Sequence, residues 1–141
     1  MTISLRKART IIRKAIEKSR EMDFKPMSVV VVDAGGHVQA FEREDGAAPG
    51  RFAIAHGKAH GAIMLGMAGT AQMARAEQQA YFIGAMNGLF DGQFVPVPGG
   101  VLVRDRKGAV VAAVGVTGDS SDNDAIAAVA GIEAAGLTGE I

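Results

Sequence analysis

The chain has 141 residues, of which 48% are hydrophobic and 21% charged, and its 15 basic and 15 acidic residues cancel. This size predicts one domain, residues 1–141, and the neutral charge argues against a nucleic-acid partner. The sequence has no cysteine, which excludes disulfides and thiolate-bound metals. It also has no run of the roughly 20 apolar residues of a membrane span and no apolar signal core at its start, so we expect a cytoplasmic protein without a membrane partner.

The first third of the chain predicts a helix followed by a β-hairpin. Ser4 is a suitable N-cap, and apolar residues recur at helical spacing to about Met22. The hairpin covers Met27–Arg43, and its β-branched run Val29–Val32 predicts a strand covered on both faces. Gly35-Gly36 supplies the positive φ of a tight turn. The second strand then leads into the charged residues Glu42–Asp45, which are followed by the Gly/Pro-containing loop 46–50.

The rest of the chain alternates helices with one more hairpin. A second helix over 52–64 is dense in small residues, and a third runs from about 70 to 88. Strands at 101–104 and 109–117 form the second hairpin, and a polar loop caps a last helix over 125–135. This order predicts one antiparallel sheet with helices packed on it, an α+β fold.

Four motifs together resemble the GlcG/HbpS-like haem-binding family, also called the haem-degrading family and found as the C-terminal domain of PduO-type adenosyltransferases. The motifs are VVDAGGHVQAFEREDGA at Val31–Ala47, IAHGKAHGA at Ile54–Ala62, PVPGGVLVRDRKGAVVAAVGVTGD at Pro96–Asp119 and SDNDAIAAVAGIEAAGL at Ser121–Leu137. The resemblance implies a profilin-like fold, with a five-stranded antiparallel sheet and helices on both faces, and assembly into homo-oligomers from dimers to octamers. The fifth strand would lie near Gln93–Val95.

Two histidines on the second helix are the main candidates for chemistry. His56 and His60 are four residues apart, so their rings lie on one side of the helix, close enough to hold one metal ion or haem iron or to divide acid and base roles. Lys58 points elsewhere and would neutralise a substrate carboxylate or a haem propionate. In the family pattern Lys58 matches a usual lysine, whereas His60 departs from the usual small or hydroxyl residue. The alternative for the pair is packing and surface hydrogen bonding.

Further candidates lie in loops that the resemblance places around a pocket. Pro98-Gly99-Gly100 exposes backbone N–H groups suited to an anion or a planar ring, or simply begins the third strand. Thr117 and Asp119 would converge on the same rim. The predicted ligand-binding residues are Lys58, Arg43, Asp45, Pro98, Gly99, Gly100, Thr117 and Asp119.

The leading hypothesis is a small-molecule binding protein that takes haem or a related carboxylate-bearing ligand between the second helix and the Gly-rich loops. The alternative is a cofactor-independent or metal-assisted lyase or isomerase for a small organic acid. In that enzyme His56 and His60 would be the acid–base residues with Glu42 as a further catalytic group, and a divalent metal would bind His56 and His60. An oligomeric scaffold without a ligand is a third hypothesis.

Overall fold

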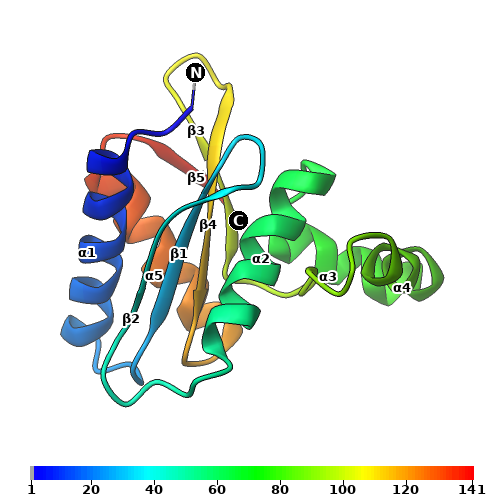
Figure 1. The fold of residues 1–141 in the computed structure, drawn as a ribbon, viewed down its shortest axis with the longest axis horizontal. Helices are drawn as coiled ribbons and strands as arrows, with labels where there is room; N and C mark the ends of the chain where they lie inside the picture. The colour runs from blue at the N-terminus through cyan, green and yellow to red at the C-terminus, as the bar shows by residue number, and fades with distance from the viewer. Residues whose placement is uncertain (1) are drawn as a thin grey trace.

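The computed structural model describes residues 2–141 as a five-stranded antiparallel sheet with helices on both faces (Figure 1). The strand order is β2-β1-β4-β3-β5, so β2 and β5 form the edges. The strands are β1 (Ser28–Asp33), β2 (Val38–Arg43), β3 (Gly100–Arg104), β4 (Val110–Thr117) and β5 (Thr138–Glu140), and the helices are α1 (Leu5–Glu21), α2 (Arg51–Leu65), α3 (Gly69–Gln78), α4 (Ala80–Leu89) and α5 (Ser121–Ala134). The predicted α+β class is confirmed.

β1 lies inside the sheet and is covered on both faces, as its sequence predicts. Val29 and Val31 join the core formed with α1 and α5, while Val30 and Val32 join the core formed with α2. β1 pairs with β2 on one side and with β4 on the other. A continuous run of valine suits such a strand because both sets of alternating side chains are buried.

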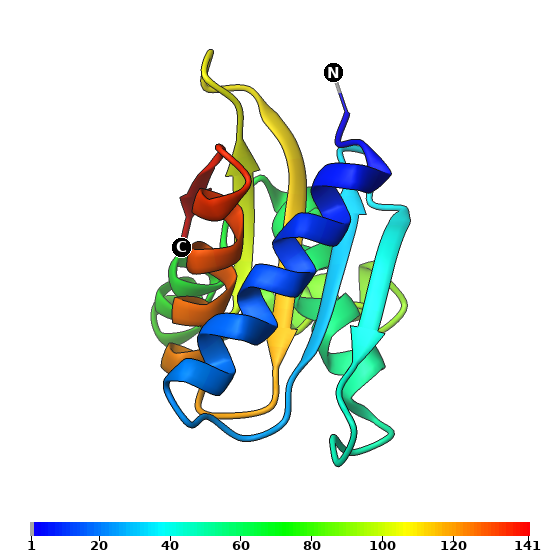
Figure 2. The ribbon, with the colours of Figure 1, turned by 90° about the vertical axis from the view of Figure 1, so that its left-hand side faces the viewer.

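The helices divide between the two faces of the sheet. α1 and α5 lie side by side on one face (Figure 2), and α2 covers the other. The predicted caps are confirmed: Ser4 accepts a hydrogen bond from the Lys7 amide, and Ser120 accepts one from the Asn123 amide at the start of α5. Among residues 2–141, no helix combines the length and the apolar character needed to span a bilayer.

The predicted third helix is in fact two helices. The backbone of Gln79 leaves the helical region, with φ −139° and ψ 66°, and separates α3 from α4. The Gln79 side chain accepts a hydrogen bond from the Arg75 guanidinium, which stabilises the break. No Gly or Pro marks this position, so the sequence pattern gave no signal for it. α3 and α4, residues 69–89 and here called the arm, project away from the sheet (Figure 1).

The fifth strand is also not where the sequence analysis placed it. β5 lies at Thr138–Glu140 and pairs with β3, where Arg104 Nε lies 2.9 Å from Glu140 Oε1. Gln93–Val95 instead forms an irregular loop that returns to α2, with the Val95 amide donating to the Gly57 carbonyl at 3.2 Å. This loop becomes part of the candidate site.

Candidate functional site on the outer side of α2

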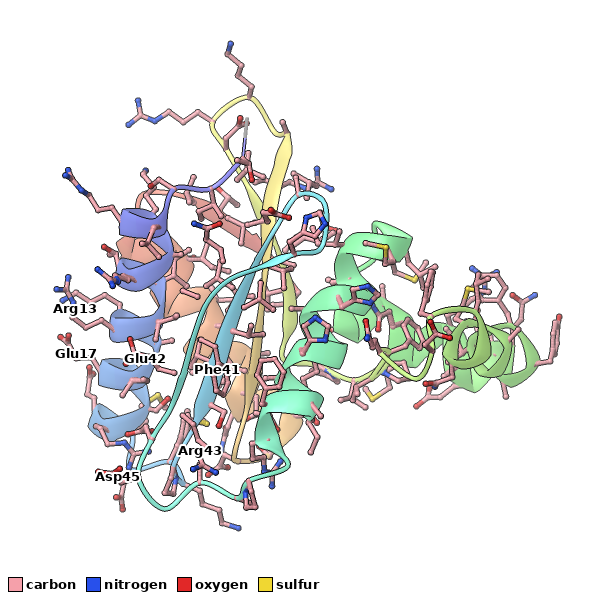
Figure 3. All side chains as sticks on the ribbon, viewed as in Figure 1. Arg13, Glu17, Phe41, Glu42, Arg43 and Asp45 are labelled. Carbon is pink, nitrogen blue, oxygen red and sulfur yellow. The ribbon has the colours of Figure 1, made fainter. Side chains whose placement is uncertain are left out.

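A row of aromatic rings follows a partly exposed side of α2 beside the β1–β2 hairpin, which we call the outer side. Phe52, His56 and His60 recur every four residues and therefore share this side. Ring centroids lie 5.7 Å apart between Phe52 and His56 and 5.3 Å apart between the two histidines, both stacked. Phe41 of β2, labelled in Figure 3, meets Phe52 edge-on with ring centroids 4.8 Å apart, and Phe90 meets His60 edge-on at 6.0 Å. We call this row, extended by Phe94 beyond Phe90, the aromatic ladder: Phe41, Phe52, His56, His60, Phe90 and Phe94.

A backbone carbonyl selects the tautomer of the neutral His60 ring. His60 Nδ1 lies 2.9 Å from the carbonyl oxygen of Gln93. A carbonyl only accepts, so Nδ1 carries the hydrogen and, in the neutral ring, Nε2 carries the lone pair. This arrangement is the usual support of a metal-ligating histidine, whose other nitrogen donates to a carbonyl or carboxylate.

His56 is held in its neutral form by its surroundings. Burial, and to a smaller extent the charge of His60, lowers the pKa of His56 from its usual 6.5. Within residues 2–141 no three His, Cys, Asp or Glu side chains cluster closely enough to hold a metal ion. The predicted metal site therefore has two histidines and lacks a third ligand of these types.

Two loops position the histidine side of α2. Gly36, at φ +87°, forms the β1–β2 turn, and a Cβ there would meet Met64 and lie 3.5 Å from the His60 ring. The second loop follows α4 and contains Phe94. Gly57 and Gly61 leave room for it, because a Cβ on Gly61 would lie 2.6 Å from the Phe94 ring. This close approach places the Gln93 carbonyl on His60.

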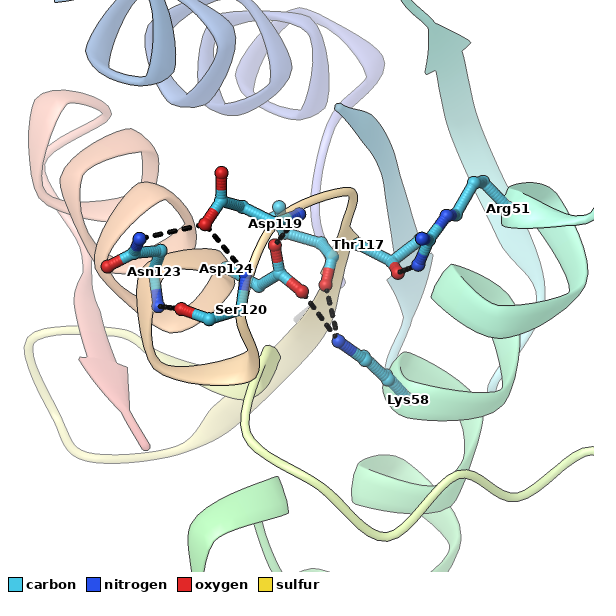
Figure 4. A network of polar contacts seen from close by, with 8 residues as sticks. Arg51, Lys58, Thr117, Asp119, Ser120, Asn123 and Asp124 are labelled. Atoms are coloured by element: carbon cyan, nitrogen blue, oxygen red, sulfur yellow. Dashed lines mark hydrogen bonds and ion pairs between the residues drawn. The ribbon is translucent and has the colours of Figure 1, made fainter. Parts of the chain in front are cut away.

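Lys58 faces inward and forms a buried ion pair with Asp124 (Figure 4). Its ammonium lies 3.0 Å from Asp124 Oδ2 and donates to the Val116 carbonyl at 3.0 Å, and both side chains are only 2% exposed. Burial lowers the pKa of Lys58 and raises that of Asp124, while the attraction between them opposes both shifts. Lys58 therefore links α2 to α5 and does not lie on the same side of α2 as the two histidines.

The Pro98–Gly100 loop is packed against this ion pair. All three residues are buried. A Cβ on Gly99 would lie 2.8 Å from the Lys58 ammonium, and one on Gly100 would lie 2.5 Å from the Lys58 carbonyl. The absence of side chains on the two glycines thus allows the loop to pack closely against α2. Their backbone does not line the histidine side of the helix.

Thr117 and Asp119 are also engaged within the fold. Thr117 is buried and accepts a hydrogen bond from Arg51 at 2.8 Å. Asp119 accepts from the amides of Lys25 and Ser120 and from the side chain of Asn123, and these bonds, that of the Lys25 amide foremost, lower the pKa of Asp119 to about 2. Asp119 therefore acts as a connector between loops (Figure 4).

The charged end of β2 lies apart from the histidines. Glu42 lines an open groove of about 710 Å³ beside α1, on the opposite face of the sheet from α2. Arg43 and Asp45 line a smaller hollow of about 360 Å³ with Glu42 and Ile16 of α1, and Figure 3 shows both at the loop end of the strand. The structure thus brings His56 and His60 together but does not bring Glu42, Arg43 or Asp45 to them.

The comparisons with known proteins decide the family. The family model described as "Haem degrading protein HbpS-like" matches residues 3–133. The chain belongs to this HbpS-like family. Among solved structures, a double mutant of HbpS from Streptomyces reticuli is 28% identical over 94% of this chain and 86% of its own, with a TM-score of 0.80. The Klebsiella pneumoniae protein ORFY is 26% identical over 96% and 92%, with a TM-score of 0.81.

A third similar structure is a PduOC:haem complex, 23% identical over 97% of both chains with a TM-score of 0.86. This likeness confirms the fold of the family, including the sheet and its two helical layers. No curated protein matches the chain significantly.

Proposed function

We propose that the chain binds haem on the outer side of α2, where His60 would hold the iron. The observation that carries this proposal is the Gln93 carbonyl 2.9 Å from His60 Nδ1. It leaves Nε2 as the nitrogen with the free lone pair, which is the state that a haem ligand needs. The family resemblance marks His60 as a departure from the usual small or hydroxyl residue, so an imidazole ligand here would be a feature of this chain.

The side chains around His60 are mostly aromatic, which suits contact with a flat, mostly apolar ligand. Phe52 and Phe90 flank the two histidines, and Phe52 is 40% exposed on this side of the helix. A neutral His56 adds a further ring and no positive charge beside a cationic iron. Aromatic rings with one well-placed polar atom are the usual lining of a cofactor site.

Both histidines present their rings to the same side of the site. The rings of His56 and His60 are stacked with a tilt of 29°, so both nitrogens approach from the same side of α2. The chain's own residues would therefore bind and orient the haem from this side, and haem would supply a redox-active iron.

The comparisons support haem as the ligand class. The matching family is described as haem degrading, and the PduOC structure is a haem complex. Assembly into homo-oligomers and a cytoplasmic location remain predictions. The lyase or isomerase hypothesis loses one of its three groups, because Glu42 lies across the sheet from the histidines.

A haem titration followed by absorption spectroscopy tests the proposal. Wild-type protein should bind stoichiometric haem with a shifted Soret band, and His60→Ala should weaken binding by more than roughly tenfold, with the spectrum restored by added imidazole. His56→Ala is the matched control on the same helix and should keep the wild-type spectrum. Equal affinity and an equal spectrum in His60→Ala and wild type would overturn the assignment.

A further inference from the structure

The two edges of the sheet differ in length and charge. β5 has three residues, and its Glu140 is paired with Arg104 of β3. β2 has six residues, and the first four, Val38–Phe41, carry no charge. Within residues 2–141, no strand pairs with the outer edge of β2 (Figure 2). A long edge strand with few charges presents unpaired backbone N–H and C=O groups that can bind a further strand.

Arginines line the groove beside this edge. The groove has a volume of about 710 Å³ and lies between α1 and β2, with Glu42 lining it from the strand. Arg6, Arg9 and Arg13 line it from α1, and their spacing of three and four residues places them on one side of the helix. Figure 3 labels Arg13 on the helix and Glu42 on the strand. The groove is therefore mainly positive.

The three arginines differ from later cations of α1 in having no acidic partner. Ion pairs within the chain engage three other cations of this helix: Lys14, Lys18 and Arg20. Across residues 2–141, Arg6, Arg9 and Arg13 form no ion pair, and all three are exposed. Guanidinium groups bind carboxylates in a bidentate geometry. The groove therefore complements a partner with carboxylate side chains.

We propose that the β2 edge and this groove bind an acidic peptide segment in an extended conformation, which adds to the sheet as a sixth strand. Antiparallel addition continues the pairing found throughout the sheet. Alternate side chains of the added strand lie on the α1 side, as those of Ala40 and Glu42 do. They recur about every 7 Å, and Arg6 to Arg13 span about 10 Å along an ideal helix. Two acidic residues, two positions apart, therefore face the arginines.

Glu42 sets the direction of the peptide. It lies beside Ile16 in a second hollow at the end of β2, nearly three helical turns after Arg6. A carboxylate repels a further acid there and favours a basic residue. In antiparallel addition the N-terminal part of the peptide lies at this end, so the preferred order is one basic residue followed by two acidic residues at alternate positions. A uniform polyanion such as a nucleic acid places negative charge against Glu42 and leaves β2 unpaired.

Fluorescence anisotropy tests the contact with a labelled peptide in which one lysine and then two glutamates alternate with threonine. The full chain should bind the peptide saturably, and Arg9→Glu should weaken binding at least tenfold. Arg106→Glu is the matched control, because it changes the net charge equally at an exposed residue of the β3–β4 turn that does not line the groove. It should bind as wild type does. An equal loss in both variants would overturn the proposal, as would a wild type that binds no peptide because a second copy covers β2.

Backbone pairing is tested by changing the peptide, which leaves the fold of the protein untouched. Methylation of alternate peptide nitrogens removes hydrogen-bond donors without changing charge. Methylation of the set that faces β2 should weaken binding at least tenfold, and methylation of the other set should weaken it much less. Equal affinities of the two methylated peptides would overturn strand addition. Displacement of the peptide by oligothymidylate at similar concentrations would overturn the peptide as the partner in favour of a nucleic acid.

Discussion

Lys58 and His60 are two residues apart on α2, yet the structure gives them opposite environments. Lys58 is 2% exposed and paired with Asp124 beneath the Pro98–Gly100 loop. His60 lies in the aromatic ladder with Nδ1 on the Gln93 carbonyl, which leaves the lone pair of the neutral ring on Nε2. The inner side of α2 therefore holds the fold together, and the outer side carries the proposed chemistry. Variants on the inner side should lower stability and leave haem affinity unchanged. Variants on the outer side should lower haem affinity and leave stability largely unchanged.

The largest effect is expected from breaking the buried ion pair. Asp124→Ala leaves the Lys58 ammonium without its partner in the interior and should lower the free energy of unfolding by about 3–5 kcal/mol in urea denaturation. Asp122→Ala, at an exposed position in the same first turn of α5, is the control and should cost at most about 1 kcal/mol. Adding Lys58→Met to Asp124→Ala should recover part of the loss. Equal costs for Asp124→Ala and Asp122→Ala would contradict the role of the pair.

A smaller loss is expected from crowding the glycine loop. Gly100→Ala pushes a methyl group to 2.5 Å from the Lys58 carbonyl and should cost about 1–3 kcal/mol of unfolding free energy. Gly50→Ala is the control, because a Cβ there meets nothing within 4 Å. Haem affinity should stay at the wild-type value in both folded variants. If Gly100→Ala lowered haem affinity without lowering stability, the loop would belong to the ligand site after all.

The smallest effect concerns the pH dependence of His56. Its pKa is lowered in the folded chain, chiefly by burial, so the unfolded chain binds a proton more readily. This contribution to stability is complete above the ordinary pKa of 6.5 and is lost as pH falls through 6.5 toward the lowered folded value. His56→Gln should flatten the fall in urea midpoint below that pH. An unchanged slope in His56→Gln would show that its surroundings do not hold it neutral.

Short-range patterns in the amino-acid sequence predicted much of the fold. The valine run, the two hairpins and the helix caps are decided by neighbours in sequence, and the structure confirms them. β5 escaped prediction because a strand of three residues depends on pairing with β3, which lies far away in the chain. The break at Gln79 likewise depends on a side-chain contact with Arg75 and has no Gly or Pro signal.

The candidate site was predictable only in its helical part. The spacing of His56 and His60 places their rings together, and the structure shows this. The partner of each group comes from elsewhere in the chain: the Gln93 carbonyl for His60 and Asp124 for Lys58. One sequence signal indicated that a loop approaches α2 closely: a glycine directly follows each histidine, at Gly57 and Gly61. The family resemblance places Pro98–Gly100 at a pocket, and the composition of the loop does not show which side of a helix it meets.

The most direct test of the account is the identity of the nitrogen bound to iron. Pulsed electron paramagnetic resonance of the ferric haem complex, made with protein whose histidines carry a heavy nitrogen isotope, detects a coordinating histidine directly. The account predicts this coupling in wild type and in His56→Ala, and its loss in His60→Ala. Coupling that persists in His60→Ala, or that is absent from wild type with haem bound, would contradict the assignment of His60 as the axial ligand.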